Sequence, residues 1–129
     1  MRGGDLTPTR AAISVGFGLF VGCLPLYGLH LPLVLAVCVP LRLDAPVAYL
    51  AANISNPLVA PWILVAEVQT GSWLLTHSFV GFDASTARST GVTGYVVYAA
   101  LGALVVGGVL ALVGACCAGI LSARWASRT

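Results

Sequence analysis

Three long runs of sequence contain no charged residue, and they limit how the chain can fold more than any other feature. They cover residues 11–41, 45–66 and 89–123. A helix needs about 20 apolar residues to cross the roughly 30 Å hydrocarbon core of a bilayer. The chain is 59% hydrophobic and 8% charged, whereas soluble domains carry about 25% charged residues. The sequence therefore predicts a single all-α integral membrane domain over its 129 residues, with the lipid bilayer as its first partner.

Prolines divide the apolar half of the chain into short pieces. Six of the seven lie between Pro25 and Pro61. A proline inside a helix costs about 3 kcal/mol because it removes a backbone hydrogen bond and clashes with the preceding turn. Thr7, Asp44 and Asn56 stand just before prolines and are expected to begin helices. The expected helices cover residues 8–24, 31–41, 45–55, 57–77 and 95–124.

Four units follow from these breaks. Residues 8–41 are expected to form a re-entrant helical hairpin, since residues 31–41 would span only about 16 Å. A Pro-broken spanning segment follows at 45–77 (a broken helix pair), then a polar loop at 78–94 and one long C-terminal transmembrane helix at 95–124. Irregular backbone at membrane depth is tolerated only where it is buried in protein or lines a wet cavity. The breaks therefore predict a partly wet cavity or a protein partner.

The arginines predict an orientation. All six positive charges are arginines and the net charge is +2, which is too weak a balance to indicate nucleic acid binding. If residues 45–77 cross the membrane once, Arg88 lies outside and the other five arginines lie in the cytoplasm, as the positive-inside rule favours. A second re-entrant loop at 45–77 would instead send the C-terminus outward. We expect both termini to be cytoplasmic.

Small residues predict where helices approach each other closely. In the last helix they recur every four residues, and the ridge includes Ala103, Gly107, Ala111 and Ala115. The helix that packs on this ridge belongs either to the same chain or to a neighbour in a homo-oligomer. Gly18 and Gly22 have the same spacing, while Pro25 and Gly28 predict the tight turn of the hairpin.

Polar residues near the breaks form the candidate ligand-binding site, because polarity inside a membrane is costly. They are His30, Asn53, Ser55, Asn56, Pro57 and Glu67. A helix starting at Asn56-Pro57 would offer free N–H groups and a partial positive charge to an anion, helped by Asn53 and Ser55. The alternatives are structural: Asn56 caps its own helix, and Asn53 and Ser55 bond to freed carbonyls.

Two of the candidates depend on their surroundings. His30 can serve simply to cap the second arm of the hairpin. Glu67 needs a partner such as Arg10 or His30 if it lies near the midplane, but it can snorkel if it lies near the surface. The sequence leaves both possibilities open.

Two functions remain after the motif search. The sequence contains no nucleophile–base motif, metal-ligand spacing or phosphate-binding glycine loop, so no enzyme, cofactor or metal is predicted. The first function is transporter-like handling of an anionic lipid headgroup or small anion at the broken-helix ends. The alternative is a non-catalytic membrane anchor or assembly subunit for an envelope glycan or lipid enzyme. Water-accessible polar residues would favour the first, and a dry, partner-covered surface the second.

Several motifs occur in a recognisable order. They are Thr7-Pro8, residues 24–30, Leu41-Arg42-Leu43, Asn53-Ile54-Ser55-Asn56-Pro57-Leu58 and residues 67–71. This order, over residues 7–75, resembles a prokaryotic membrane family known as domain of unknown function 2062. Asp44 stands where an asparagine is expected in that family. The resemblance implies a small bacterial-type inner-membrane protein, sometimes joined to glycosyltransferase-like domains, with no assigned activity.

Overall fold

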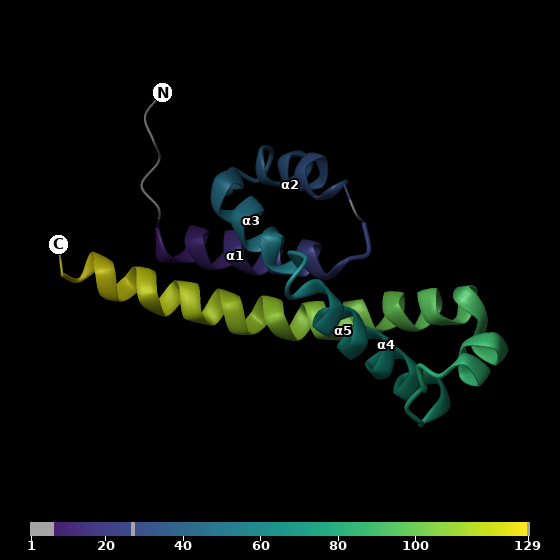
Figure 1. Cartoon of the computed structure of the whole chain (residues 1–129). Helices are drawn as coiled ribbons and strands as arrows, with labels where there is room; N and C mark the ends of the chain where they lie inside the picture. The colour runs from purple at the N-terminus through teal and green to yellow at the C-terminus, as the bar shows by residue number, and fades with distance from the viewer. Residues whose placement is uncertain (1–6, 27, 129) are drawn as a thin grey trace.

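The computed structural model describes residues 7–26 and 28–128, and the regular elements over them are all helices. The elements are α1 (Pro8–Cys23), α2 (His30–Cys38), α3 (Ala45–Ala52), the 3-10 turn η1 (Asn53–Ser55), α4 (Ala60–Thr76) and α5 (Ala84–Ala126). Figure 1 shows α5 running along the whole molecule, with the shorter helices beside it. The predicted all-α class is confirmed. Arg2 and Tyr27, which the orientation and the family resemblance use, lie outside the described residues.

Helix starts follow the capping residues. The Thr7 hydroxyl accepts the N–H of Arg10 at 3.3 Å, and the Asp44 carboxylate accepts the N–H of Val47 at 3.1 Å. Each satisfies a donor that the first helical turn would otherwise leave free. The N–H of Asp44 in turn donates to the Ser14 hydroxyl at 2.9 Å. This bond fixes the start of α3 against the first half of α1.

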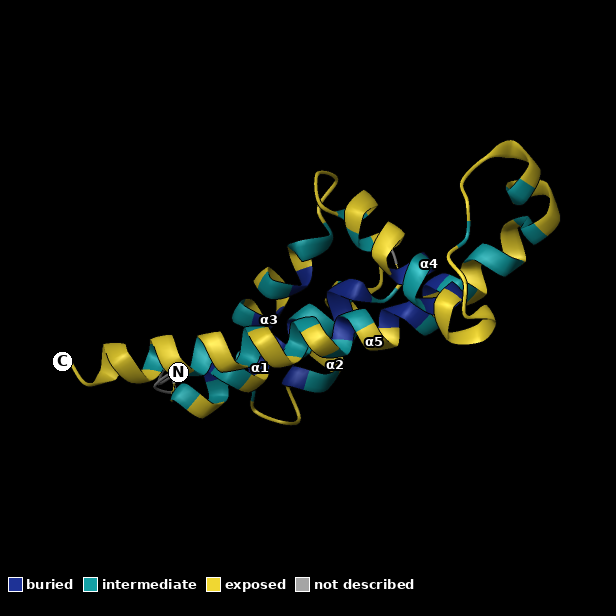
Figure 2. Ribbon diagram, turned by 90° about the horizontal axis from the view of Figure 1, so that it is seen from below, coloured by how far each residue is buried: buried dark blue, intermediate teal, exposed yellow. Residues whose placement is uncertain are grey.

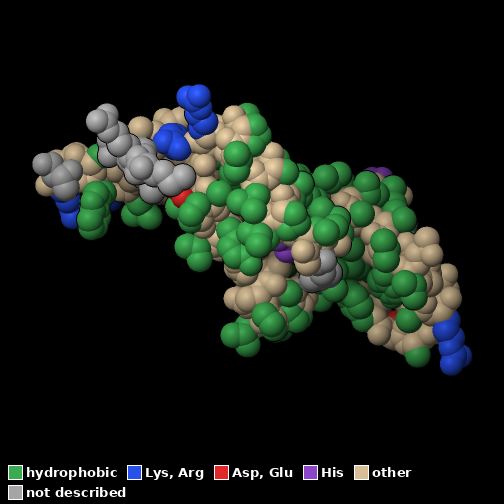
Figure 3. All heavy atoms as spheres, turned by 90° about the horizontal axis from the view of Figure 1, so that it is seen from above, with side chains coloured by type: hydrophobic (Ala, Val, Ile, Leu, Met, Phe, Trp, Pro, Cys, Tyr) green, Lys and Arg blue, Asp and Glu red, His purple; other side chains and the backbone are tan. Residues whose placement is uncertain are grey.

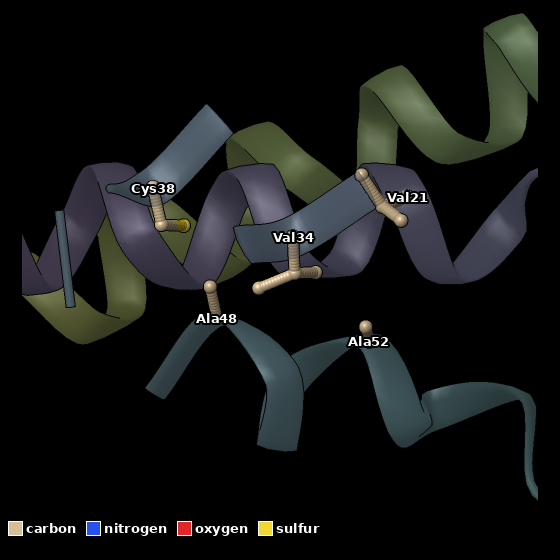
Figure 4. Close-up of a cluster of buried hydrophobic side chains, with 5 residues drawn as sticks. All are labelled: Val21, Val34, Cys38, Ala48 and Ala52. Atoms are coloured by element: carbon tan, nitrogen blue, oxygen red, sulfur yellow. The ribbon is translucent and has the colours of Figure 1, made fainter. Parts of the chain in front are cut away.

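Glycines let α3 lie directly on α1. A Cβ added to Gly18 would lie 2.1 Å from the Ala48 carbonyl oxygen, and one on Gly22 would lie 2.5 Å from that of Ala52. The contact moves forward by four residues on both helices, from Gly18–Ala48 to Gly22–Ala52, so α1 and α3 run parallel. Helix α2 connects them in the chain and runs back in the opposite direction. Side chains from these three helices form the buried cluster in Figure 4. Its members are Val21, Val34, Cys38, Ala48 and Ala52.

The small-residue ridge of α5 packs against α1 of the same chain. A Cβ on Gly16 would lie 3.0 Å from both the Ala111 carbonyl oxygen and the Ala115 Cβ. Farther back along α5, a Cβ on Gly107 would lie 3.1 Å from the Cβ of Cys23. The two helices are therefore antiparallel. Of the two alternatives for the ridge, the structure shows packing within the chain, and self-association stays a prediction.

The other half of α5 crosses α4 at still closer range. A Cβ on Gly102 would lie 1.7 Å from the backbone oxygen of Glu67, and one on Gly71 would lie 1.8 Å from that of Tyr98. Only hydrogen fits at either position. Neither glycine belongs to the ridge predicted from the sequence, since Gly102 lies one residue before the ridge position Ala103 and so faces a different helix.

The segment expected as a polar loop, residues 78–94, is different in the structure. It is helical from Ala84, and only Gly91, with φ of 67°, interrupts the helix. The physical reason is the Asp83 cap, which accepts the N–H of Thr86 at 3.1 Å. Hydrogen bonds from Ser85 and Thr86 hold the pKa of the Asp83 carboxyl well below its usual range. Serine and threonine indicated polarity here, whereas the cap decided the conformation.

By length and composition, one helix of the described chain can cross a membrane, and a second crossing is possible. The first is α5, and the second is the pair Ala45–Ser55 and Ala60–Thr76, which is bent by 76° at the break. Figure 2 shows buried residues gathered in the middle of the molecule and exposed residues along both ends of α5. Much of the exposed surface is apolar, including Leu112 at 71% and Trp62 at 77% exposed.

Gly102→Ala tests the close crossing of α4 and α5. We expect it to destabilise the protein by about 1–3 kcal/mol, because the new methyl overlaps the Glu67 backbone oxygen. Gly108→Ala is the matched control, since its methyl would meet no atom within 4 Å and alanine favours a helix by about 0.5–1 kcal/mol. Thermal unfolding of both variants in the same detergent measures the difference. Equal midpoints would contradict the crossing.

Candidate functional site

Three helix ends meet beside the middle of α5. Helix α1 ends at Cys23, η1 ends at Ser55 and α4 begins at Ala60. A cavity between these ends is lined by residues 22–25, Ser55, Glu67 and the first turn of α4. We call this the junction cavity. Its volume of about 10 Å³ is close to the least that one water molecule needs.

Polar side chains near the junction close the broken ends of the helices. The Ser55 hydroxyl donates to the Gly22 carbonyl oxygen and so ties η1 to the end of α1. The Leu24 carbonyl oxygen accepts the N–H of Leu26 at 2.7 Å, and Nε2 of His30 lies 3.3 Å from it. Ser55 thus makes the carbonyl bond that was its structural alternative. His30, the first residue of α2, bonds back to the end of α1.

Asn56 caps the turn before α4 with both of its oxygens. Its side-chain oxygen accepts the N–H of Leu58 at 2.9 Å and of Val59 at 3.1 Å, and its carbonyl accepts the N–H of Ala60 at 2.8 Å. Residues 57–59 form a turn, so α4 begins three residues later than predicted. Pro57 has no N–H to offer. An anion at this helix start would have to displace the Asn56 side chain.

His30 and Asn53 share a second cavity next to the junction. It has a volume of about 190 Å³ and is lined by Gly28, His30, Leu31, Tyr49, Ala52 and Asn53. We call it the His30 cavity. The Asn53 amide donates one N–H to the Tyr49 carbonyl oxygen at 2.9 Å, which leaves its second N–H available to an anion. The cavity has room for several water-sized molecules or one small anion.

Glu67 is buried although it carries a carboxyl group. Its side chain is 3% exposed, and its Oε1 has no hydrogen-bond partner among the described residues. Neither expected partner pairs with it: Arg10 donates to the backbone oxygen of Arg42, and Nε2 of His30 faces Leu24. The structure therefore shows the side chain buried within the protein. The depth of Glu67 in a membrane, on which the two alternatives depend, stays a prediction.

The structure thus separates the predicted site residues into three groups. Ser55 and Glu67 line the junction cavity, and His30 and Asn53 line the His30 cavity. Asn56 and Pro57 are exposed at the turn between α3 and α4. No group of three or more His, Cys, Asp or Glu residues that can hold a metal occurs in the described part of the chain.

Sequence reasoning missed the contribution of α1 and α5 to the junction. The end of α1 supplies backbone carbonyls, and Gly102 of α5 admits the α4 backbone beside Glu67. The clue for α1 was the turn after Cys23, where the chain continues into Leu24-Pro25. For α5 the clue was a glycine outside the four-residue ridge.

Asn56→Ala tests the cap at the break. We expect a loss of about 1 kcal/mol, because two N–H groups lose their acceptor. Asn56→Asp keeps a side-chain oxygen and should unfold within a few tenths of a kcal/mol of the unchanged protein. Thermal unfolding in detergent compares the three proteins. Identical midpoints for all three would show that Asn56 contributes nothing to the break.

Comparison with known proteins places the chain in a family. No curated protein and no solved structure matches it. The family described as "Uncharacterized protein conserved in bacteria (DUF2062)" matches residues 3–129. The match includes the predicted region 7–75 and extends through α5 to the C-terminus. The resemblance is confirmed, and the chain belongs to this bacterial family.

Proposed function

We propose that this protein is a small multi-pass inner-membrane protein that handles an anionic lipid headgroup or small anion in the manner of a transporter. One observation carries the proposal: three broken-helix ends meet beside the middle of α5, the helix that can span a membrane. Discontinuous helices of transporters place their binding sites near the bilayer midplane in this way.

The exposed apolar surface supports membrane insertion. Soluble proteins rarely expose contiguous apolar patches larger than a few hundred Å². Here large apolar side chains face outward on several helices, among them Leu50 at 73%, Trp62 at 77% and Leu112 at 71% exposed. On the face shown in Figure 3, arginine side chains lie toward the two ends and hydrophobic side chains lie between them. Lipid would cover the apolar middle.

The distribution of arginines supports the predicted orientation. Arg10 at the start of α1 donates to Arg42 before α3, and Ala12 lies against Gly119 near the end of α5. Arg124 follows on α5, so these arginines gather at one end of the molecule, while Arg88 precedes the kink at the other end. A hairpin formed by α1 and α2, a bent span formed by α3 and α4, and a return through α5 would put both termini in the cytoplasm.

The depth of the junction also supports a transporter-like site. The apolar part of α5 covers residues 95–123, and its midpoint is close to Gly107. Gly107 contacts Cys23 at the end of α1, and Gly102 contacts Glu67. If α5 spans the bilayer, the junction and the adjoining His30 cavity lie near the midplane.

The His30 cavity is the part of the structure that best fits an anion. The second N–H of the Asn53 amide can donate to an anion there, and the cavity is far roomier than the junction cavity. The N–H groups at the start of α4 are already bonded to Asn56. We therefore place the anion beside His30 and Asn53 rather than at Asn56-Pro57.

An apolar groove favours the second candidate function, a non-catalytic anchor or assembly subunit for an envelope glycan or lipid enzyme. The groove lies between α4 and α5 and has a volume of about 490 Å³. Its lining includes Leu64, Val68, Phe82, Val92 and Tyr95. A helix of a membrane enzyme could lie in it, and such a role would require no anion in the His30 cavity.

Cysteine labelling in intact cells tests the orientation. The four native cysteines are replaced, and single cysteines are introduced by Ser85→Cys or Arg128→Cys. We expect an impermeant maleimide to label only the Ser85 position, because α5 would carry its two ends to opposite sides of the membrane. After the cells are opened, both positions should react. Labelling of Arg128→Cys in intact cells would contradict the single crossing by α3 and α4.

Lipid binding tests the anion site. We expect His30→Ala and Asn53→Ala each to weaken binding of phosphatidylglycerol by about tenfold, the loss of roughly one charge-assisted or polar hydrogen bond. Native mass spectrometry of the purified protein measures binding, with phosphatidylcholine as the uncharged control and inorganic phosphate as the lipid-free anion. Asn56→Asp is the matched variant outside the cavity and should bind as the unchanged protein does. Full binding by both alanine variants would refute the proposed site and favour the anchor role.

A further inference from the structure

The environment of Glu67 differs from that of an anion site. Glu67 is the single glutamate of the sequence, and its carboxyl is almost fully buried with Oε1 unpaired among the described residues. The junction cavity beside it has room for about one water molecule. A buried carboxylate without a counter-charge is costly, so this carboxyl calls for a positive ligand rather than a negative one.

The end of α1 adds negative potential at the same place. Helix α1 ends at the junction, and the C-terminal end of a helix carries partial negative charge. Helix α4 begins there with partial positive charge, but the N–H of Ala60 already donates to the Asn56 carbonyl oxygen. The titratable group that faces Glu67 from α1 is the Cys23 thiol. From α5 it meets the backbone of Gly102, and Nε2 of His30 of α2 lies 3.3 Å from the Leu24 carbonyl oxygen. No arginine lines the junction cavity in the described structure.

We propose that Glu67 is a proton-binding site that exchanges its proton with water in the junction cavity. In the release step the O–H bond of the carboxylic acid breaks, its electron pair stays on the carboxylate, and the proton passes to the water molecule. The reverse step restores the acid and neutral water. The Ser55 hydroxyl uses its hydrogen on Gly22, so its oxygen can accept a bond from that water. The proposal rests on the proposed function only for its membrane setting, and it would link anion handling to protons.

The groups around Glu67 favour a proton over a metal ion. Sodium or another metal ion would need several oxygen ligands, and the Gly22 carbonyl oxygen at this cavity already accepts the Ser55 hydroxyl. The described residues offer no cluster of acidic, histidine or cysteine side chains around Glu67. A proton needs only the carboxyl group and one water molecule.

Because the sequence has one glutamate, carbon-13 labelling of glutamate reports on this carboxyl alone. The protein is reconstituted in lipid nanodiscs with unlabelled glutamine supplied during growth, and the side-chain carboxyl resonance is followed by NMR from about pH 5 to about pH 10. We expect the shift of a protonated acid near neutral pH and a reversible change to that of a carboxylate as the pH rises. Glu67→Gln should abolish the resonance and keep the fold, whereas Asp83→Asn should leave the titration unchanged.

Three results would overturn the proposal. The carboxyl could be ionised over the whole pH range, it could stay protonated to the highest pH without exchange, or its chemical shift could change with the sodium concentration at constant pH and ionic strength.

Thermal unfolding supplies a second measurement, since Glu67→Gln should be at least as stable as the unchanged protein. Failure of phosphatidylglycerol binding with the Glu67 titration intact would refute the anion site and leave the proton site standing.

Discussion

Broken helices in an apolar chain leave backbone N–H and C=O groups without partners, and the structure depends on how these groups are satisfied. In an apolar environment nothing else offers hydrogen bonds, so each unmet group costs several kcal/mol. Side chains of the same chain supply hydrogen bonds to these backbone groups. Asn56 accepts the N–H groups before α4, Ser55 donates to the end of α1, and His30 bonds to Leu24. The breaks are therefore stable parts of the fold.

Close helix contacts bring these breaks to one place. Gly18 and Gly22 seat α3 on α1, and Gly102 seats α4 on α5. At such short range the backbone of one helix touches the backbone of the next, and a side chain between them is excluded. The ends of α1 and η1 and the start of α4 consequently meet beside α5. Glu67 becomes buried as a consequence of this packing, because Gly102 draws its backbone against α5.

The junction cavity and the His30 cavity are lined by different polar side chains. The His30 cavity contains an imidazole and an amide side chain, and the junction cavity contains a carboxyl group. Leu24 lies beside both: it lines the junction cavity, and its carbonyl oxygen lies 3.3 Å from Nε2 of His30. We place the anion in the first cavity and the proton in the second. This proximity is the physical basis for linking the two proposals.

The sequence by itself determined where most of the helices break, and the tertiary structure decided which residues share a site. Prolines and capping residues act within a few positions, so the breaks after Cys23, Cys38 and Ser55 lie close to where they were expected. The helical turns at residues 84–90 were missed, because the Asp83 cap was not distinguished from loop polarity. Local patterns also found the polar candidates, but they could not show that His30 and Asn53 separate from Ser55 and Glu67, or that Glu67 is buried. Those facts depend on helix crossings at Gly22 and Gly102 between segments far apart in the sequence, and such contacts form only when the whole chain packs.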